Sequence, residues 1–240
     1  MKKVTHQKIT SRKEIKASSR AWLQRQINDV YVQSRAKDGW RCRAAYKFLE
    51  INSKYRLVRP GLVMVDLGAA PGGWSQVMAK LSGKTANPEA KGCIVGIDLL
   101  DIAPMPGVIF LQGDFTIPAM QQQLQEVVKN HAVANEQGRM IDLVVSDMAA
   151  NTTGHRDTDY LRTQYLADLA LDFALNQLKQ GGAFVTKIFQ GGGEAEFQKT
   201  LKACFTKVHN VKPPASRAES REMYVVATGF RGYSAPDIES

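Results

Sequence analysis

This chain of 240 residues has little cysteine and no long apolar run. Its three cysteines, Cys42, Cys93 and Cys204, lie far apart and show no CxxC spacing. We therefore expect reduced thiols in a cytoplasmic protein, and neither a disulfide framework nor a zinc or other metal site. No apolar run approaches the roughly 18 residues of a transmembrane helix, and the basic N-terminus lacks the apolar centre of a secretory signal.

Acidic residues are scarce in the first quarter of the chain. Residues 1–60 hold 16 Lys or Arg and only 4 Asp or Glu, a net charge of +12, whereas residues 61–240 have a net charge of −3. Such asymmetry indicates a polyanionic partner. The segment has no clear apolar face of Trp, Phe and Leu, which favours nucleic acid over an anionic membrane surface. Within it, residues 1–18 are also well explained as a solvated, flexible tail.

The GxGxxG fingerprint of dinucleotide-binding enzymes is absent as well. Instead, an apolar run over 62–67 leads into Asp66-Leu67-Gly68-Ala69-Ala70-Pro71-Gly72-Gly73-Trp74, and a helical pattern follows to Leu81. This order predicts a strand, a turn and a helix; the glycines allow a ligand close to the backbone, and the helix N-terminus offers free N–H groups. The spacing is similar to the first motif of S-adenosylmethionine-dependent methyltransferases, and a tight turn in another α/β protein is the alternative.

Strand and helix patterns alternate along the rest of the chain. A helix is expected from Ser18 or Ser19 to Gly39, where glycine breaks the pattern, and a second over Cys42–Tyr55. The remaining predicted helices are Trp74–Leu81, Pro118–His131, Asp159–Leu178 and Ala195–Phe205. The predicted strands are Val63–Leu67, Cys93–Asp98, Val108–Gln112, Ile141–Ser146, Ala183–Phe189, Val208–Val211 and Met223–Thr228. The alternation predicts a doubly wound, mostly parallel sheet of seven strands that ends in an antiparallel hairpin.

Acidic residues end or follow four successive predicted strands: Asp66, Asp98, Asp114 and Asp147. Ligands in doubly wound sheets bind at the carboxyl ends of the strands. A single aspartate there is more often a helix cap, but its repetition favours a binding site. Lys187 interrupts an apolar run that is otherwise typical of a central strand. Its amine could extend to solvent at the strand end, yet the neighbouring Asp147 favours a paired, functional lysine.

Several separate motifs, taken together and in this order, resemble the FtsJ family of ribose 2′-O-methyltransferases. They are Arg41-Cys42-Arg43-Ala44-Ala45-Tyr46-Lys47, Asp66–Gln76, Gln112–Phe115, Ser146–Ala149, Lys187–Gly191 and Ser216–Tyr224. The resemblance implies a Rossmann-like S-adenosylmethionine-dependent fold over 19–230, with a helical RNA-docking segment at 19–60 and flexible tails at 1–18 and 231–240. In the bacterial branch the implied substrate is a uridine in large-subunit ribosomal RNA.

The resemblance also assigns roles to residues of this chain. It implies a catalytic tetrad of Lys47, Asp147, Lys187 and Glu222. The cofactor contacts expected from the turn, the strand ends and the resemblance are Gly68, Gly72, Trp74, Asp98, Asp114 and Asp147. Candidate RNA contacts are Arg20, Arg25, Arg41, Arg43, Arg217 and Arg221. Trp40 and Tyr46 could stack on bases, although core packing explains them equally well. We expect a monomer that acts on ribosomal RNA, within the large subunit, and away from membranes.

Methyl transfer from a sulfonium requires an acceptor oxygen that lies in line with the breaking bond and has lost its proton. Lys187 in its neutral form could take that proton from a ribose hydroxyl. Burial and a second cation such as Lys47 both favour a neutral lysine. Asp147 and Glu222 favour the charged form instead, so their role would be to orient the two amines. A surface salt bridge to Arg221 or Lys212 is the alternative for Glu222.

Other functions stay open at this point. A small-molecule methyltransferase would explain the turn and Asp98, but neither the charge asymmetry nor Lys187. An NAD-dependent oxidoreductase is disfavoured by the missing GxGxxG. Within RNA-directed functions, the target could be a transfer RNA or an mRNA cap, or the chain could be a non-enzymatic ribosome assembly factor. Strong salt dependence of substrate binding would distinguish RNA from small molecules.

Overall fold

The structure is a computed structural model that describes residues 23–24, 27–132, 138–150, 153–190, 195–217 and 219–232. The predicted tail at 1–18, nearly all of the one at 231–240, and the candidate RNA contacts Arg20 and Arg25 lie outside these ranges. All three cysteines lie inside them as free thiols. Within the same ranges, no helix is both long enough and apolar enough to cross a bilayer.

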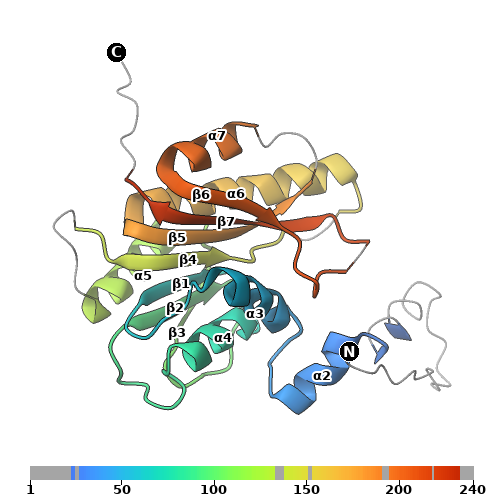
Figure 1. Ribbon diagram of the computed structural model, residues 1–240, viewed down its shortest axis with the longest axis horizontal. Coiled ribbons are helices and arrows are strands. Elements are labelled where there is room, and N and C mark those ends of the chain that lie inside the picture. The colour runs from blue at the N-terminus through green and yellow to red at the C-terminus, as the bar shows by residue number, and fades with distance from the viewer. Residues whose placement is uncertain are drawn as a thin grey trace.

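Seven strands form one sheet in the order β3-β2-β1-β4-β5-β7-β6 (Figure 1). Their bounds are β1 Val63–Leu67, β2 Cys93–Asp98, β3 Ile109–Gln112, β4 Ile141–Ser146, β5 Leu178–Phe189, β6 Phe205–Val211 and β7 Glu222–Phe230. β1 to β5 pair in parallel, and β7 runs antiparallel to both β5 and β6. The predicted hairpin is confirmed, with its second strand inserted between β5 and β6.

Six helices are described in full: α2 Val30–Asp38, α3 Ala44–Tyr55, α4 Gly73–Leu81, α5 Pro118–His131, α6 Arg156–Gln177 and α7 Ala195–Cys204. The single helix expected from Ser18 or Ser19 to Gly39 is interrupted at Asp29, although residues 23, 24 and 27 are helical; its predicted start lies outside the described residues. Asp29 has extended backbone angles and caps α2, because its carboxylate accepts the backbone N–H groups of Tyr31 and Val32. α2 ends where predicted, at Gly39 in the left-handed region (φ 74°).

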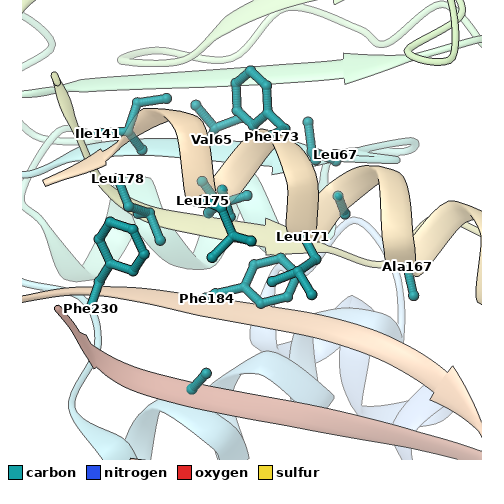
Figure 2. Close-up of a cluster of buried hydrophobic side chains, with 14 of the residues drawn as sticks. Val65, Leu67, Ile141, Ala167, Leu171, Phe173, Leu175, Leu178, Phe184 and Phe230 are labelled. Carbon is teal, nitrogen blue, oxygen red and sulfur yellow. The ribbon is translucent and has the colours of Figure 1, made fainter. Parts of the chain in front are cut away.

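Two apolar layers bury the sheet on both faces. On one face Val63, Val65 and Leu67 of β1 pack with side chains from α5, α6 and α7. Figure 2 shows part of this layer, where residues of α6 lie against the strands. On the other face Met64 packs with side chains from α3 and α4. Strands covered on both faces are apolar at nearly every position, which is why the strand patterns in the sequence are continuous rather than alternating.

The strand order places a crevice at the carboxyl end of β1. From β1 the chain proceeds to β2 and β3 on one side, and then returns to pair β4 with β1 on the other side. The connections after β1 and β4 therefore leave in opposite directions. In doubly wound sheets this reversal of strand order is where ligands bind. Asp66 near the end of β1 and Asp147 directly after β4 lie at this point.

Candidate active site

Four elements bring the predicted catalytic tetrad together. Lys187 of β5 is only 7% exposed, and its Nζ donates to the backbone oxygen of Asp147 at 2.7 Å and to Asp147 Oδ1 at 3.2 Å. Lys47 of α3 forms an ion pair with Glu222 of β7. The structure therefore excludes the solvent-facing alternative for Lys187 and provides two lysine–carboxylate pairs at one end of the sheet.

The surface salt bridge considered for Glu222 is also excluded. The guanidinium of Arg221 donates to the backbone oxygen of Gln190, and Lys212 Nζ donates to the backbone oxygen of Ser220. Burial alone would raise the pKa of Glu222. The positive charges of Lys47 and Lys187 outweigh that effect, so the pKa is lowered and the carboxyl group stays ionised at neutral pH.

Tyr224 lies at the centre of the tetrad and was missed by the sequence analysis. Its hydroxyl oxygen is 2.8 Å from Asp147 Oδ1, 2.7 Å from Glu222 Oε1 and 3.1 Å from Lys47 Nζ. Burial and the two carboxylates raise its pKa well above the usual value, so the hydroxyl keeps its proton. Strand alternation was the available signal, because Glu222 and Tyr224 are two residues apart in β7 and share a face. Tyr224 joins the two ion pairs into one network.

A cavity of about 310 Å³ opens beside the tetrad, between the carboxyl ends of β1, β2, β3 and β4 and the first half of α6. Three of the predicted cofactor contacts line it: Gly68, Asp98 and Asp114. Asp98 holds two loops in place, because its Oδ2 accepts the backbone N–H of Ala70 and its Oδ1 accepts that of Leu100. Asp114 Oδ1 accepts the backbone N–H and the hydroxyl of Thr116.

Three other predicted cofactor contacts do not line this cavity. Trp74 is buried in the core, where its indole N–H donates to the backbone oxygen of Ala44 and its ring stacks on Phe48. Its side chain is thus a packing group. Gly72 faces Arg41, and Asp147 faces the lysine and tyrosine of the tetrad. Gly72 and Trp74 therefore support the turn from outside the cavity, whereas Gly68 of the same turn lines it.

Several other residues that line the cavity were not predicted from the sequence. They include Leu99, Phe115, Met148, Arg162 and Tyr165. Leu99 and Phe115 directly follow the predicted Asp98 and Asp114, so the strand-end argument could have included them. Arg162 and Tyr165 come from α6, and no signal in the sequence indicated which turn of that helix reaches the site. Only the packing of α6 on the sheet places them there.

Asp66 is fully buried beneath this region. Its Oδ2 accepts the hydroxyl of Ser75 at 2.6 Å, whereas Oδ1 has no hydrogen-bond partner among the described residues. Burial raises the pKa of Asp66 to about 7, against a smaller lowering by the hydrogen bond from Ser75. The carboxyl group of Asp66 therefore changes between its protonated and ionised forms near pH 7.

Four candidate RNA contacts are described, and all of them contact other parts of the protein. Arg43 pairs with Asp29 at 3.1 Å and donates to the backbone oxygen of Ala215, while Arg217 lies 3.8 Å from the same aspartate. Arg221 bonds the loop after β5, and Arg41 bonds three backbone carbonyls. These contacts tie α2 and α3 to the loop between β6 and β7, so the basic segment is built into the rim of the site.

The two aromatic candidates for base stacking, Tyr46 and Trp40, differ in their burial and in their neighbours. Tyr46 is 6% exposed and donates its hydroxyl to Asp38, which favours the core-packing alternative. Trp40 is half-buried, and the amine of Lys80 lies 4.9 Å from its ring centre.

The arrangement agrees with what comparison with known proteins shows. The family model of FtsJ-like methyltransferases matches residues 40–230. Ribosomal RNA large subunit methyltransferase E from Brucella anthropi is 52% identical over 219 residues, which cover 91% of this chain and 86% of the relative. The protein of the same name from Brucella canis has the same identity and coverage.

Solved structures agree with this. A ribosomal RNA methyltransferase from Plasmodium falciparum is 30% identical with a TM-score of 0.68, over 81% of this chain and all of that one. Fibrillarin from Aeropyrum pernix with natively bound S-adenosyl-L-methionine shares the fold at 17% identity and a TM-score of 0.51, over 78% of this chain and 75% of that one. This chain belongs to the FtsJ-like methyltransferase family.

Proposed function

We propose that this methyltransferase transfers the methyl group of S-adenosylmethionine to the 2′-hydroxyl of a uridine in large-subunit ribosomal RNA. The observation that carries the proposal is the buried contact between Lys187 and Asp147, beside a cavity at the point where the strand order reverses. The names of the relatives from Brucella and Plasmodium support ribosomal RNA as the substrate. The net charge of +12 over residues 1–60 supports a polyanionic partner.

The residues of the cavity fit S-adenosylmethionine. Asp98 and Asp114 offer carboxylate oxygens to ribose hydroxyl groups and to an adenine amine. Leu99, Phe115 and Met148 supply apolar surface suited to a purine ring. When bound, the cofactor supplies an electrophilic methyl group on a sulfonium.

The tetrad then acts on the acceptor. Lys187 in its neutral form takes the proton of the ribose hydroxyl while the new C–O bond forms and the methyl–sulfur bond breaks, so the proton ends on Lys187 Nζ. Asp147 holds the amine in position through two hydrogen bonds. Lys47, Glu222 and Tyr224 form the other half of the network, and the charge of Lys47 favours an anionic oxygen near it.

The substrate assignment is tested by mapping methyl groups. We expect the purified protein with S-adenosylmethionine to add one 2′-O-methyl group to a uridine of large ribosomal subunits isolated from cells that lack the gene. Primer extension at low nucleotide concentration locates the modification. Methylation of transfer RNA or capped RNA instead, or of no RNA at all, would contradict the proposal. A monomeric, cytoplasmic enzyme is part of the same proposal, and sedimentation of the purified protein measures its oligomeric state.

The cofactor site is tested by replacing Asp98. Asp98→Ala removes at least one charge-assisted hydrogen bond, which contributes roughly 1.5–3 kcal/mol, so cofactor affinity should fall by at least roughly ten- to a hundredfold. Calorimetry with S-adenosylhomocysteine measures the loss. Asp101→Ala is the matched control, because Asp101 is an exposed acid of the same loop and should leave the affinity unchanged. Equal affinities for wild type and Asp98→Ala would show that Asp98 does not bind the cofactor.

A further inference from the structure

We propose that Arg41 is a positioning residue of the cofactor site rather than a contact to RNA phosphate; the inference rests on the cofactor proposal above. Its Nη1 donates to the backbone oxygens of Pro71 at 3.3 Å and Ala103 at 2.7 Å, and its Nη2 donates to that of Pro104 at 2.7 Å. The side chain thus joins the turn after β1 to the loop after β2.

The guanidinium has few donors left for another partner. Arginine carries five N–H donors, and three of them point to these carbonyls. One face of the group also lies toward the ring of Phe110, with 6.0 Å between the guanidinium carbon and the ring centre. A phosphate contact would have to replace some of these bonds. The basic pattern around Arg41 indicated RNA binding, but in the folded protein its guanidinium donates to backbone carbonyls.

The turn is shaped to receive Arg41. Gly72 has a φ of 97°, and a Cβ at this position would lie 2.9 Å from Arg41 Nη1 and 3.4 Å from the side chain of Ile102. The missing side chain therefore makes room for the guanidinium, which is a different role from close approach to a ligand. The backbone N–H of Arg41 donates to the side-chain oxygen of Gln76, so the segment before α3 is also held to α4, the helix that follows the turn.

The two segments that Arg41 joins also form part of the cavity wall. The loop after β2 begins at Asp98 and Leu99, which line the cavity, and Asp98 Oδ2 already binds the backbone N–H of Ala70 in the turn. The backbone N–H groups of Gly68 and Ala69 also donate to the backbone oxygen of Ile97. Arg41 is thus a further cross-link, which joins the turn to a later part of the loop and does not itself line the cavity. Without it, the turn would keep its bonds to Ile97 and Asp98 at the end of β2 but lose those to Ala103 and Pro104 further along the loop, and the acid would be less well placed for a ligand.

The test separates cofactor binding from RNA binding in the full chain. Arg41→Ala should weaken the affinity for S-adenosylhomocysteine by about tenfold, within the usual range of energetic coupling between sites. Arg41→Lys should be nearly as weak, because a single ammonium group does not span three carbonyls in a fixed fork. The salt dependence of binding to a large-subunit RNA transcript should stay as in wild type. Lys54→Ala is the matched control, since it removes one positive charge from an exposed position of α3.

Each other result overturns the inference in a distinct way. If Arg41→Ala keeps wild-type cofactor affinity and lowers the salt slope of RNA binding by roughly 0.7–0.9, Arg41 is a phosphate contact. If the variant loses thermal stability but keeps cofactor affinity, the cross-link is merely structural. If wild type itself fails to bind S-adenosylhomocysteine, the cofactor proposal fails instead, and the role of Arg41 falls with it.

Discussion

Replacing Lys187 with alanine is expected to abolish nearly all methyl transfer while the protein stays folded and binds its cofactor. General base catalysis typically contributes about 10²- to 10⁴-fold to a rate, so turnover on ribosomal substrate should fall by at least that range. Asp147 Oδ1 still receives the hydroxyl of Tyr224 in the variant, so the carboxylate keeps a partner. Single-turnover assays with labelled cofactor measure the loss, and calorimetry measures cofactor affinity.

Two further variants make this test specific. Lys187→Arg should be as inactive as the alanine variant, because a guanidinium does not release its proton at accessible pH. Lys179→Ala is the control on the same strand: Lys179 pairs with Asp142 at the opposite end of β5 and should be dispensable for turnover. Wild-type turnover in Lys187→Arg would show that the lysine acts only through its charge, and the general-base role would be abandoned.

The second large effect is a pH dependence of the protein's stability that Asp66 is expected to cause. Burial raises its pKa to about 7 in the folded protein, whereas an aspartate in the unfolded chain titrates near 3.9. Between about pH 4 and pH 7 the folded state therefore holds a proton that the unfolded state has lost. The contribution of Asp66 to the free energy of unfolding is therefore largest below about pH 4. It declines as the pH rises to about 7 and is constant above that pH. The shift of about three pKa units corresponds to about 4 kcal/mol.

The measurement compares wild type with Asp66→Asn, whose amide never ionises and keeps an oxygen for the hydroxyl of Ser75. The free energy of unfolding of wild type relative to the variant, from urea titrations at several pH values, should fall by about 4 kcal/mol between pH 4 and pH 7 and then stay level. Glu126→Gln, at an exposed position of α5, should show no such trend. A pH-independent difference between wild type and Asp66→Asn would show that Asp66 is ionised throughout.

The sequence by itself predicted most of the fold. Continuous apolar runs bounded by glycine and aspartate located β1, β2 and β4 at their exact bounds, because strands buried on both faces must be apolar throughout. α5 was also exact, since proline at its first position marks its start. The interruption at Asp29 was not predicted, because this cap begins a new helix, α2, where apolar spacing alone would continue the preceding one.

The sequence likewise predicted which residues converge at the catalytic site. Residues at carboxyl ends of parallel strands meet at one edge of the sheet, so Asp147 and Lys187 could be placed together by chain order. That Lys47 and Glu222 belong to the same site was implied by the family resemblance. Tyr224 was within reach of the same reasoning, since it shares a strand face with Glu222.

Only the tertiary structure decided which partner each charged or aromatic side chain has. Arg41 lies in a basic segment, but whether its guanidinium meets phosphate or protein carbonyls depends on two loops about 30 and 60 residues further along the chain. Trp74 lies in the cofactor motif, yet its ring packs on Phe48 because α3 and α4 are neighbours. Periodicity predicts which face of an element is buried. Which residues pack against that face depends on contacts between distant segments, and local sequence does not specify those contacts.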